Sequence, residues 1–142
     1  MSRKGKGTNA ERELIHLFHS IEGWSAVRVA GSGSNRYPSP DIIAGNKRRY
    51  IAIECKSTRS DKKYIDKEDL EQLRTFSARF GAEMFVGVRF MNSPWYFLRP
   101  HDLEDLGKSV AVSKSHAQKK GVLFNDLVAA QTNRSPSAEE EL

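Results

Sequence analysis

The stretch PDIIAGNKRRYIAIECK, residues 40–56, decides the fold of this 142-residue chain. Two short apolar runs, at 41–44 and 50–56, lie on either side of the turn-forming residues 45–48. Apolar runs separated by a polar, glycine-containing turn are typical of two antiparallel strands. The stretch therefore predicts a β-hairpin at the centre of a sheet.

The hairpin also predicts where its charged side chains lie. Successive side chains of a strand point to opposite faces, so Glu54 and Lys56 share one face, while Cys55 shares the other with the isoleucines. The short turn brings Asp41 to the same end of the hairpin. Two carboxylates and one lysine are thus expected to converge at one edge of the sheet.

The remaining sequence predicts an α/β fold with a mixed sheet of about five strands flanked by helices. A capping box from Thr8 to Glu11 is expected to begin the first helix, which ends at Gly23. In chain order, the other expected elements are a strand at 25–30, a flexible loop at 31–40, a polar loop at 57–65, a helix at 66–80 closed by Gly81, strands at 84–90 and 95–98, and short helical stretches at 101–106 and 124–131.

Length and charge predict one basic domain. We expect a single domain at 1–133, in which residues 1–7 form a flexible basic arm, and a disordered acidic tail at 134–142. The net charge is +5, and the tail contributes −2 because it has one arginine and three glutamates, so residues 1–133 carry +7. A positive domain attracts polyanions, and nucleic acid is the first candidate.

Several classes of protein are excluded by what the sequence lacks. It has no stretch of the roughly 18 apolar residues that a membrane span needs, and its start has no apolar signal segment. We therefore expect a cytoplasmic, chromosome-associated protein with no membrane contact. The single cysteine, Cys55, excludes an intramolecular disulfide, and no Cys-His spacing predicts a zinc site. Any metal is expected on oxygen ligands.

The acids of the hairpin fit the chemistry of phosphodiester hydrolysis. This reaction needs charge neutralisation at the phosphate and a source of hydroxide, which a divalent metal supplies. Asp41, Glu54 and the backbone carbonyl of Cys55 are oxygen ligands suited to Mg²⁺, for which Mn²⁺ is expected to substitute. Lys56 is expected to orient or deprotonate the attacking water, or to neutralise charge in the transition state; the sequence leaves both roles open.

Simpler interpretations exist for these residues. The Asp41, Glu54 and Lys56 set is also compatible with a salt-bridged strand end, and 61–63 repeats the acid-x-Lys pattern in a polar segment. Glu11 is a candidate third carboxylate, but its position also fits the capping box alone.

Five segments taken together resemble the archaeal Holliday junction resolvases of the PD-(D/E)xK nuclease superfamily. They occur in order over roughly residues 3–100, and no motif is recognised after residue 100. The segments are AERELI at 10–15, AVRVAGSGS at 26–34, PDIIAG at 40–45, IECKS at 53–57 and FSARFGA at 76–82.

The resemblance implies a restriction-endonuclease-like fold and a magnesium-dependent homodimeric endonuclease that makes paired symmetric nicks in four-way DNA junctions. By position, it implies that Glu11, Asp41 and Glu54 hold the metal and that Lys56 is the catalytic lysine. It implies a catalytic loop serine at Ser32, with Ser34 and Ser39 as alternatives. The implied active-site arginines are Arg12 and Arg28, and the implied dimer residues are Phe76 and Phe80.

A two-fold dimer suits the nearly two-fold junction, and basic residues are expected to bind its backbone with little sequence preference. Besides the two active-site arginines, these are Arg3, Lys4, Lys6, Arg36, Lys47, Arg48, Arg59, Lys62 and Lys63.

Partners and rival functions follow from the same reasoning. We expect no small-molecule cofactor, and recombination or replication proteins stay open as partners. One rival is another PD-(D/E)xK nuclease or repair nickase that acts on duplex DNA, although the chain has no separate domain large enough to read bases. The other rival is a non-catalytic DNA-binding protein.

Overall fold

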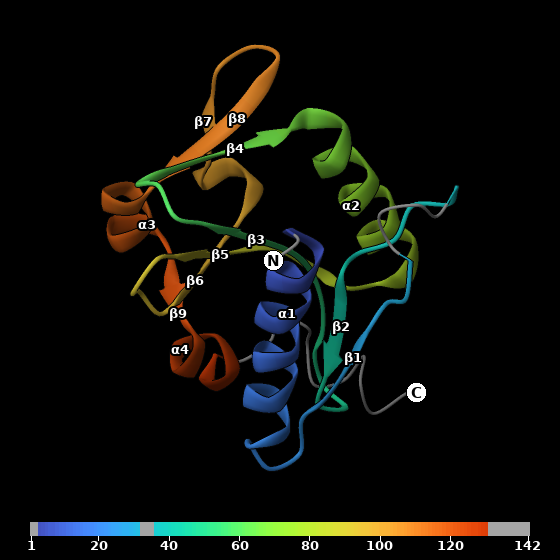
Figure 1. Cartoon of the computed structure of the whole chain (residues 1–142). Coiled ribbons are helices and arrows are strands. Elements are labelled where there is room, and N and C mark those ends of the chain that lie inside the picture. The colour runs from blue at the N-terminus through green and yellow to red at the C-terminus, as the bar shows by residue number, and fades with distance from the viewer. Residues whose placement is uncertain (1–2, 32–35, 131–142) are drawn as a thin grey trace.

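A six-stranded mixed sheet forms the centre of the molecule (Figure 1). The structure is a computed structural model that describes residues 3–31 and 36–130, so the expected tail at 134–142 lies outside it. Strands β3 and β5 pair in parallel, and all other neighbours in this sheet are antiparallel. In spatial order the strands are β1 (Ser25–Arg28), β2 (Ile42–Gly45), β3 (Tyr50–Thr58), β5 (Glu83–Phe90), β6 (Trp95–Leu98) and β9 (Val122–Leu123).

The predicted hairpin is confirmed as β2 and β3. Their register pairs Ile42 with Ile53 and Gly45 with Tyr50. The side chain of Asn46 stabilises the turn, because its Oδ1 accepts hydrogen bonds from the backbone N–H groups of Arg48 (3.1 Å) and Arg49 (2.7 Å). This local chemistry explains why the sequence was sufficient to find the hairpin.

A second, three-stranded sheet was not predicted. It has the order β4 (Lys62–Asp66), β8 (Ser109–Ser113) and β7 (Glu104–Asp105). The predicted polar loop at 57–65 is wrong, because β3 continues to Thr58 and β4 begins at Lys62. Of the β4 residues, Ile65 is the buried one, and the strand pairs with β8 far along the chain. The polar composition of β4 does not indicate a strand, because the strand is stabilised by pairing with the distant β8.

The helices are α1 (Arg3–His19), α2 (Lys67–Phe80), α3 (Lys114–Lys120) and α4 (Phe124–Ala129), with a 3₁₀ turn, η1 (Pro100–Asp102). The predicted helix start at Thr8 is wrong, and residues 3–7 of the expected arm belong to α1. Once packing nucleates a helix, each added residue gains a hydrogen bond, which offsets the low propensity of glycine. The predicted α2 is confirmed and ends at Gly81, whose φ of 82° suits glycine.

Two apolar clusters cover the two faces of the large sheet, so the alternation of β3 decides what faces each one. Ile51 and Ile53 pack on the α1 side, whereas Ala52 packs on the α2 side. Each fully buried Leu, Ile or Phe stabilises the fold by roughly 1.5–3 kcal/mol. The α1-side cluster includes Leu14, Phe18, Phe97 and Leu127, and the α2-side cluster includes Leu70, Leu73, Val86 and Val88. Within the described residues, no helix is both long and apolar enough to cross a membrane.

Candidate active site

The hairpin places Asp41 beside the end of β3, as predicted. The backbone N–H of Asp41 donates to the Ile53 carbonyl (3.0 Å), and the backbone N–H of Cys55 donates to Asp41 Oδ2 (2.8 Å). Because β2 begins only at Ile42, the Asp41 side chain takes the place of a strand partner for Cys55. This bond fixes the carboxylate of Asp41 at the edge of the sheet.

Glu54 lies next to Asp41 in an environment that disfavours its charge. Burial, followed by the charge of Asp41, raises the pKa of Glu54 from 4.5 to about 8, and a hydrogen bond between the two side chains contributes. The side chain of Glu54 is only 15% exposed. Burial and the neighbouring acid therefore favour the protonated form of Glu54. Carboxyl oxygens are ligands for divalent cations. A bound cation would offset the repulsion between the two neighbouring groups.

Lys56 is on the same face as Glu54, as the alternation of β3 predicted. Its Nζ lies 3.4 Å from Glu54 Oε2 and 3.5 Å from Asp69 Oδ2. Burial alone would lower the pKa of Lys56, but the charges of Glu54, Asp69 and Asp41 outweigh it and raise the pKa above its usual value. Lys56 is therefore an ammonium held between the carboxyl groups of Glu54 and Asp69. Asp69 was missed by the sequence analysis.

Glu11 approaches this group from α1 but is held by a different partner. Its Oε2 accepts a hydrogen bond from Arg28 Nε at 2.5 Å. Burial, then the charges of Asp41 and Glu11, raises the pKa of the Cys55 thiol, so Glu11 lies near Cys55. Within residues 3–31 and 36–130, no three His, Cys, Asp or Glu side chains converge closely enough to hold a metal. The structure thus brings Asp41 and Glu54 together, whereas Glu11 is held in an ion pair with Arg28.

The glycine-rich loop before Asp41 is described only in part. Ser32 and its alternative Ser34 lie outside the described residues. Ser39 is described, and its Oγ is buried without a hydrogen-bond partner in the described part of the chain. Arg36 is exposed and lies over the ring of Tyr37, 5.4 Å from the centroid.

The basic residues expected to bind DNA fall into separate regions. Lys47 and Arg48 are exposed at the hairpin turn, and each lies six residues along the chain from the nearer acid of the pair. Arg59 and Lys63 line a cleft of ≈ 980 Å³ beside the end of β3, whereas Lys62 pairs with Glu104 (3.9 Å). Arg12 is exposed on α1, and the side chains of Arg3, Lys4 and Lys6 lie outside the described part.

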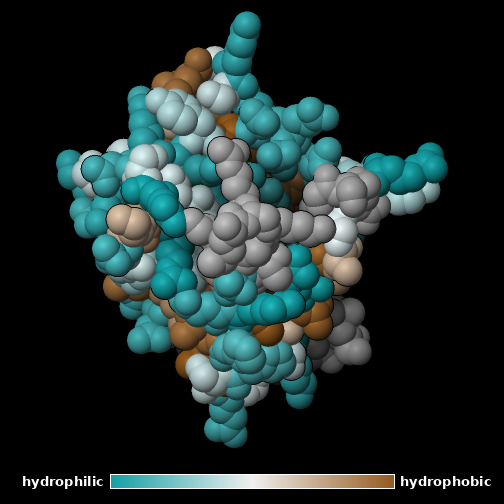
Figure 2. All heavy atoms as spheres, in the orientation of Figure 1, coloured by the Kyte–Doolittle hydropathy of each residue, from teal (hydrophilic) through white to brown (hydrophobic). Residues whose placement is uncertain are grey.

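The surface is polar around these residues. Figure 2 shows that the face seen in Figure 1 is mainly hydrophilic, with hydrophobic residues confined to smaller areas. The cleft beside β3 is also lined by Asn9, Glu13 and Arg89, and Arg89 donates a hydrogen bond to Glu13. A cleft whose lining includes the cations Arg59, Lys63 and Arg89 is suited to an anionic ligand.

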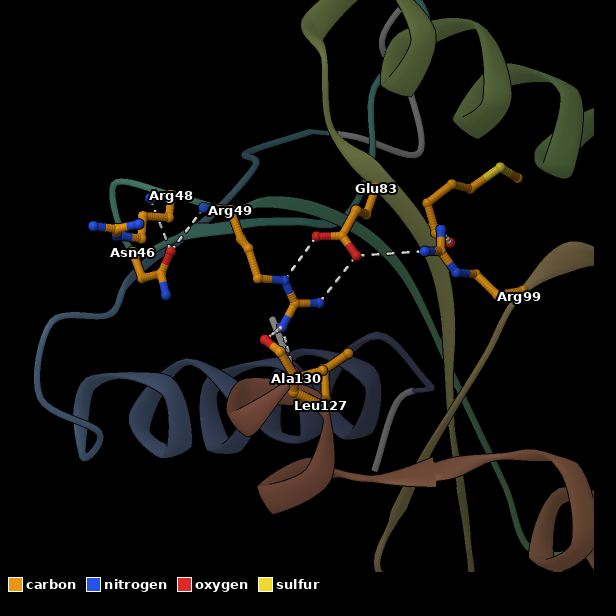
Figure 3. A network of polar contacts seen from close by, with 8 residues as sticks. Asn46, Arg48, Arg49, Glu83, Arg99, Leu127 and Ala130 are labelled. Carbon is orange, nitrogen blue, oxygen red and sulfur yellow. Dashed lines mark hydrogen bonds and ion pairs between the residues drawn. The ribbon is translucent and has the colours of Figure 1, made fainter. Parts of the chain in front are cut away.

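Arg49 belongs to the same basic stretch of sequence but has a structural role. Its side chain is 4% exposed and pairs with Glu83 through two hydrogen bonds, of 2.8 and 3.0 Å (Figure 3). It also donates to the backbone carbonyls of Leu127 and Ala130. The cluster of positive residues at 47–63 is therefore less available to a ligand than the sequence suggested.

Phe76 and Phe80 form an aromatic pair at the end of α2. Their rings are stacked, with centroids 5.0 Å apart and planes at 19°. Phe76 packs against the α2-side cluster, whereas Phe80 is 53% exposed. Phe80 thus presents an apolar surface to solvent.

The chain is similar to proteins of known family. A family model described as archaeal Holliday junction resolvase (Hjc) matches residues 2–135. The chain is 41% identical over 113 residues to the crossover junction endodeoxyribonuclease Hjc of Archaeoglobus fulgidus, covering 79% of this chain and 82% of that one. It is 35% identical over 130 residues to the Sulfolobus acidocaldarius protein of the same name, covering 90% of each.

A solved structure has the same fold. The crystal structure of Archaeoglobus fulgidus Hjc, described as a Holliday junction resolvase from an archaeal hyperthermophile, matches with a TM-score of 0.79 at 35% identity. The match covers 85% of this chain and 97% of that one.

Proposed function

The chain belongs to the archaeal Holliday junction resolvase family, and on this premise we propose that it is an endonuclease that cuts four-way DNA junctions by metal-dependent phosphodiester hydrolysis. Its fold is the restriction-endonuclease-like fold expected from the sequence. The observation that carries the proposal is the pair of Asp41 and Glu54, with Lys56 held beside it at the end of the hairpin. Junctions occur in chromosomal DNA, so we expect a cytoplasmic, chromosome-associated protein.

The residues present fit a hard divalent cation, and we propose Mg²⁺, with Mn²⁺ as a substitute. Asp41 and Glu54 would hold it, with the backbone carbonyl of Cys55 and the carboxylate of Glu11 as further ligands. When bound, the cation would supply charge neutralisation at the phosphate and lower the pKa of a nearby water molecule. The low exposure of Glu54 makes a vacant acidic pair costly, which supports this assignment.

The other residues are assigned to the phosphate and the attacking water. The ammonium of Lys56 would orient the water or neutralise charge on the phosphate, and Arg12 and Arg28 would contact phosphate oxygens. The ion pair with Arg28 fixes the position of the Glu11 carboxylate. A loop serine, with Ser32 the first candidate, is assigned to strand cleavage by the family resemblance.

A substrate panel tests the proposed function. The protein is incubated with a four-way junction, a duplex and a single strand, each with Mg²⁺, Mn²⁺ or chelator. We expect paired nicks in the junction only, and only with metal, because the two carboxyl groups cannot polarise a phosphate without a cation. The nicks are mapped on labelled strands.

Two variants and two outcomes sharpen this panel. Glu11→Gln should lose cleavage, whereas Asp61→Asn should keep it, because Asp61 is exposed in the repeated acid-x-Lys segment outside the site. Equal cutting of duplex would favour the nickase alternative. Binding without cutting in every condition would favour the non-catalytic alternative.

We also propose that the active form is a homodimer in which Phe80 lies at the interface. Phe80 is 53% exposed, and stacking on Phe76 fixes the orientation of its ring. An exposed, ordered aromatic ring of this kind is suited to a contact across a two-fold axis. Two sites on a dimer could cut opposite strands of one junction.

Sedimentation velocity tests the dimer. We expect Phe80→Glu to weaken self-association by at least about tenfold, because a charge replaces a buried aromatic ring at the contact. Tyr64→Glu is the matched control, since Tyr64 is 59% exposed but lies on β4. Wild-type protein that sediments as a monomer, or equal effects of the two variants, would contradict this assignment.

A further inference from the structure

Lys56 has carboxylate neighbours from two different elements. Glu54 lies two residues earlier on β3, whereas Asp69 is in the first turn of α2. The two distances from Lys56 Nζ are 3.4 and 3.5 Å, so neither acid is a closer partner. The ammonium is bounded by an acid from its own strand and by one from the helix.

The position of Asp69 is set by the packing of α2. The next residue, Leu70, is 5% exposed, and Leu73, one turn further, is 1% exposed. Both belong to the cluster that includes Ala52 of β3. Because these leucines fix the first turn of α2 against the sheet, the carboxylate of Asp69 is presented to the face of β3 that carries Lys56.

If Glu54 is a ligand of the cation, it cannot also be the sole ion-pair partner of Lys56. Its carboxyl group already shares a hydrogen bond with Asp41, and its Oε2 lies toward Lys56. A carboxylate has only two oxygens, so a cation held by Asp41 and Glu54 would compete with Lys56 for the same group. Asp69 takes no part in the hydrogen bond from the Cys55 N–H to Asp41 Oδ2, and its ion pair among the described residues is the one with Lys56.

We propose that Asp69 is the positioning residue for Lys56, which it anchors while Glu54 serves the cation. This inference rests on the proposed nuclease function. Lysine has a long side chain with high rotamer entropy, and a second anchor reduces the range of positions that its ammonium samples. Catalysis depends on such preorganised charge near the reacting phosphate.

An ordinary role for Asp69 predicts something different. Acidic residues in the first turn stabilise a helix through its dipole, and Glu68 is in the same turn. Glu68 is exposed and has no ion pair among the described residues, so Glu68→Gln removes the same charge from the same turn without touching Lys56. The side chain of Asp69 is 41% exposed, so its ion pair contributes little to the free energy of unfolding.

Kinetics on the full chain separate the two roles. We expect Asp69→Asn to lower the single-turnover rate of junction cleavage by about 10- to 100-fold, the usual cost of losing a supporting partner. The junction Kd and the Tm should match those of Glu68→Gln, which keeps the wild-type rate. Asp69→Glu, whose carboxylate can still reach Lys56, should recover most of the rate. A rate equal to that of Glu68→Gln, or no recovery in Asp69→Glu, would overturn the proposal.

A spectroscopic measurement tests the contact without activity. The ¹⁵N–¹H signal of the Lys56 ammonium, assigned by its absence from Lys56→Met, should be observable in metal-loaded wild-type protein and broadened by solvent exchange in Asp69→Asn. An unchanged signal in Asp69→Asn would overturn the positioning role. If wild-type protein does not cut junctions, the proposed function fails, but this signal still reports whether Asp69 holds Lys56.

Discussion

Glu54→Gln is expected to abolish junction cleavage and, at the same time, to make the metal-free protein more stable at alkaline pH. Loss of a metal ligand removes charge stabilisation from the transition state, and we expect the rate to fall by at least about 10³-fold, equivalent to ~4 kcal/mol. The gain in stability has a separate cause. Glutamine keeps the shape of Glu54 but never carries the charge that burial and Asp41 oppose.

The pH dependence of this gain follows from the direction of the shift. The pKa of Glu54 is about 8 in the folded protein and near its ordinary 4.5 in the unfolded chain, so folding favours the protonated form. The resulting stabilisation is fully present below pH 4.5 and is lost as the pH rises through 8. Glu54→Gln does not lose it, so the difference in Tm between the variant and wild type should be larger at pH 9 than at pH 5.

Thermal unfolding in chelator at pH 5 and pH 9 measures the difference in Tm between Glu54→Gln and wild type. We expect this difference to grow by a few degrees between the two pH values. Added Mg²⁺ should raise the Tm of wild-type protein and leave that of Glu54→Gln nearly unchanged. The control is Glu71→Gln, which removes a charge from the exposed ion pair between Glu71 and Arg74 on α2. A variant that still cuts, or that is less stable than wild type at pH 9, would contradict the assignment of Glu54.

The sequence was a good guide where the contacts are local. The turn at 45–48 and the alternation of β3 depend on neighbours in the chain, and together they predicted that Asp41, Glu54 and Lys56 meet. The family resemblance then added Glu11, which the structure pairs with Arg28, and its role in the site stays a prediction.

The sequence was a poor guide where a contact joins distant segments. Asp69 looks like any acid at the start of a helix, and only the docking of α2 on the sheet brings it to Lys56. For the same reason β4 was read as a loop, because its partner β8 supplies the pairing that its own composition does not indicate. Propensity describes a segment alone, whereas these contacts depend on the tertiary fold.

Arg49 is the clearest example, and it leads to the second large effect. Within a run of three basic residues it resembles a solvated or DNA-binding side chain, yet it is buried and joins β3 to β5 and α4. Glu83 also contacts Arg99 at 3.4 Å (Figure 3). The guanidinium of Arg49 lies over the ring of Trp24, 5.8 Å from the centroid. The Arg49 side chain therefore donates hydrogen bonds to one carboxylate and to two backbone carbonyls.

Arg49→Ala is expected to lower the free energy of unfolding by about 3–5 kcal/mol, the usual cost of removing one partner of a buried ion pair. The loss removes a donor from the carbonyls of Leu127 and Ala130, and within residues 3–31 and 36–130 it leaves Glu83 with Arg99 as its ion-pair partner. Arg48→Ala, at the adjacent exposed position, should change stability by less than about 0.5 kcal/mol. Urea unfolding with matched m-values measures both.

Stability and DNA binding can then be told apart for this basic stretch. Arg49 is buried, so under conditions where Arg49→Ala is still folded it should bind and cut a junction as wild type does. Arg48→Ala should instead weaken junction binding and reduce its salt dependence, because an exposed cation that contacts phosphate releases a counterion. If Arg49→Ala were stable but defective in binding, the basic stretch at 47–49 would have to act as one DNA-binding surface, and the structural role of Arg49 would be wrong.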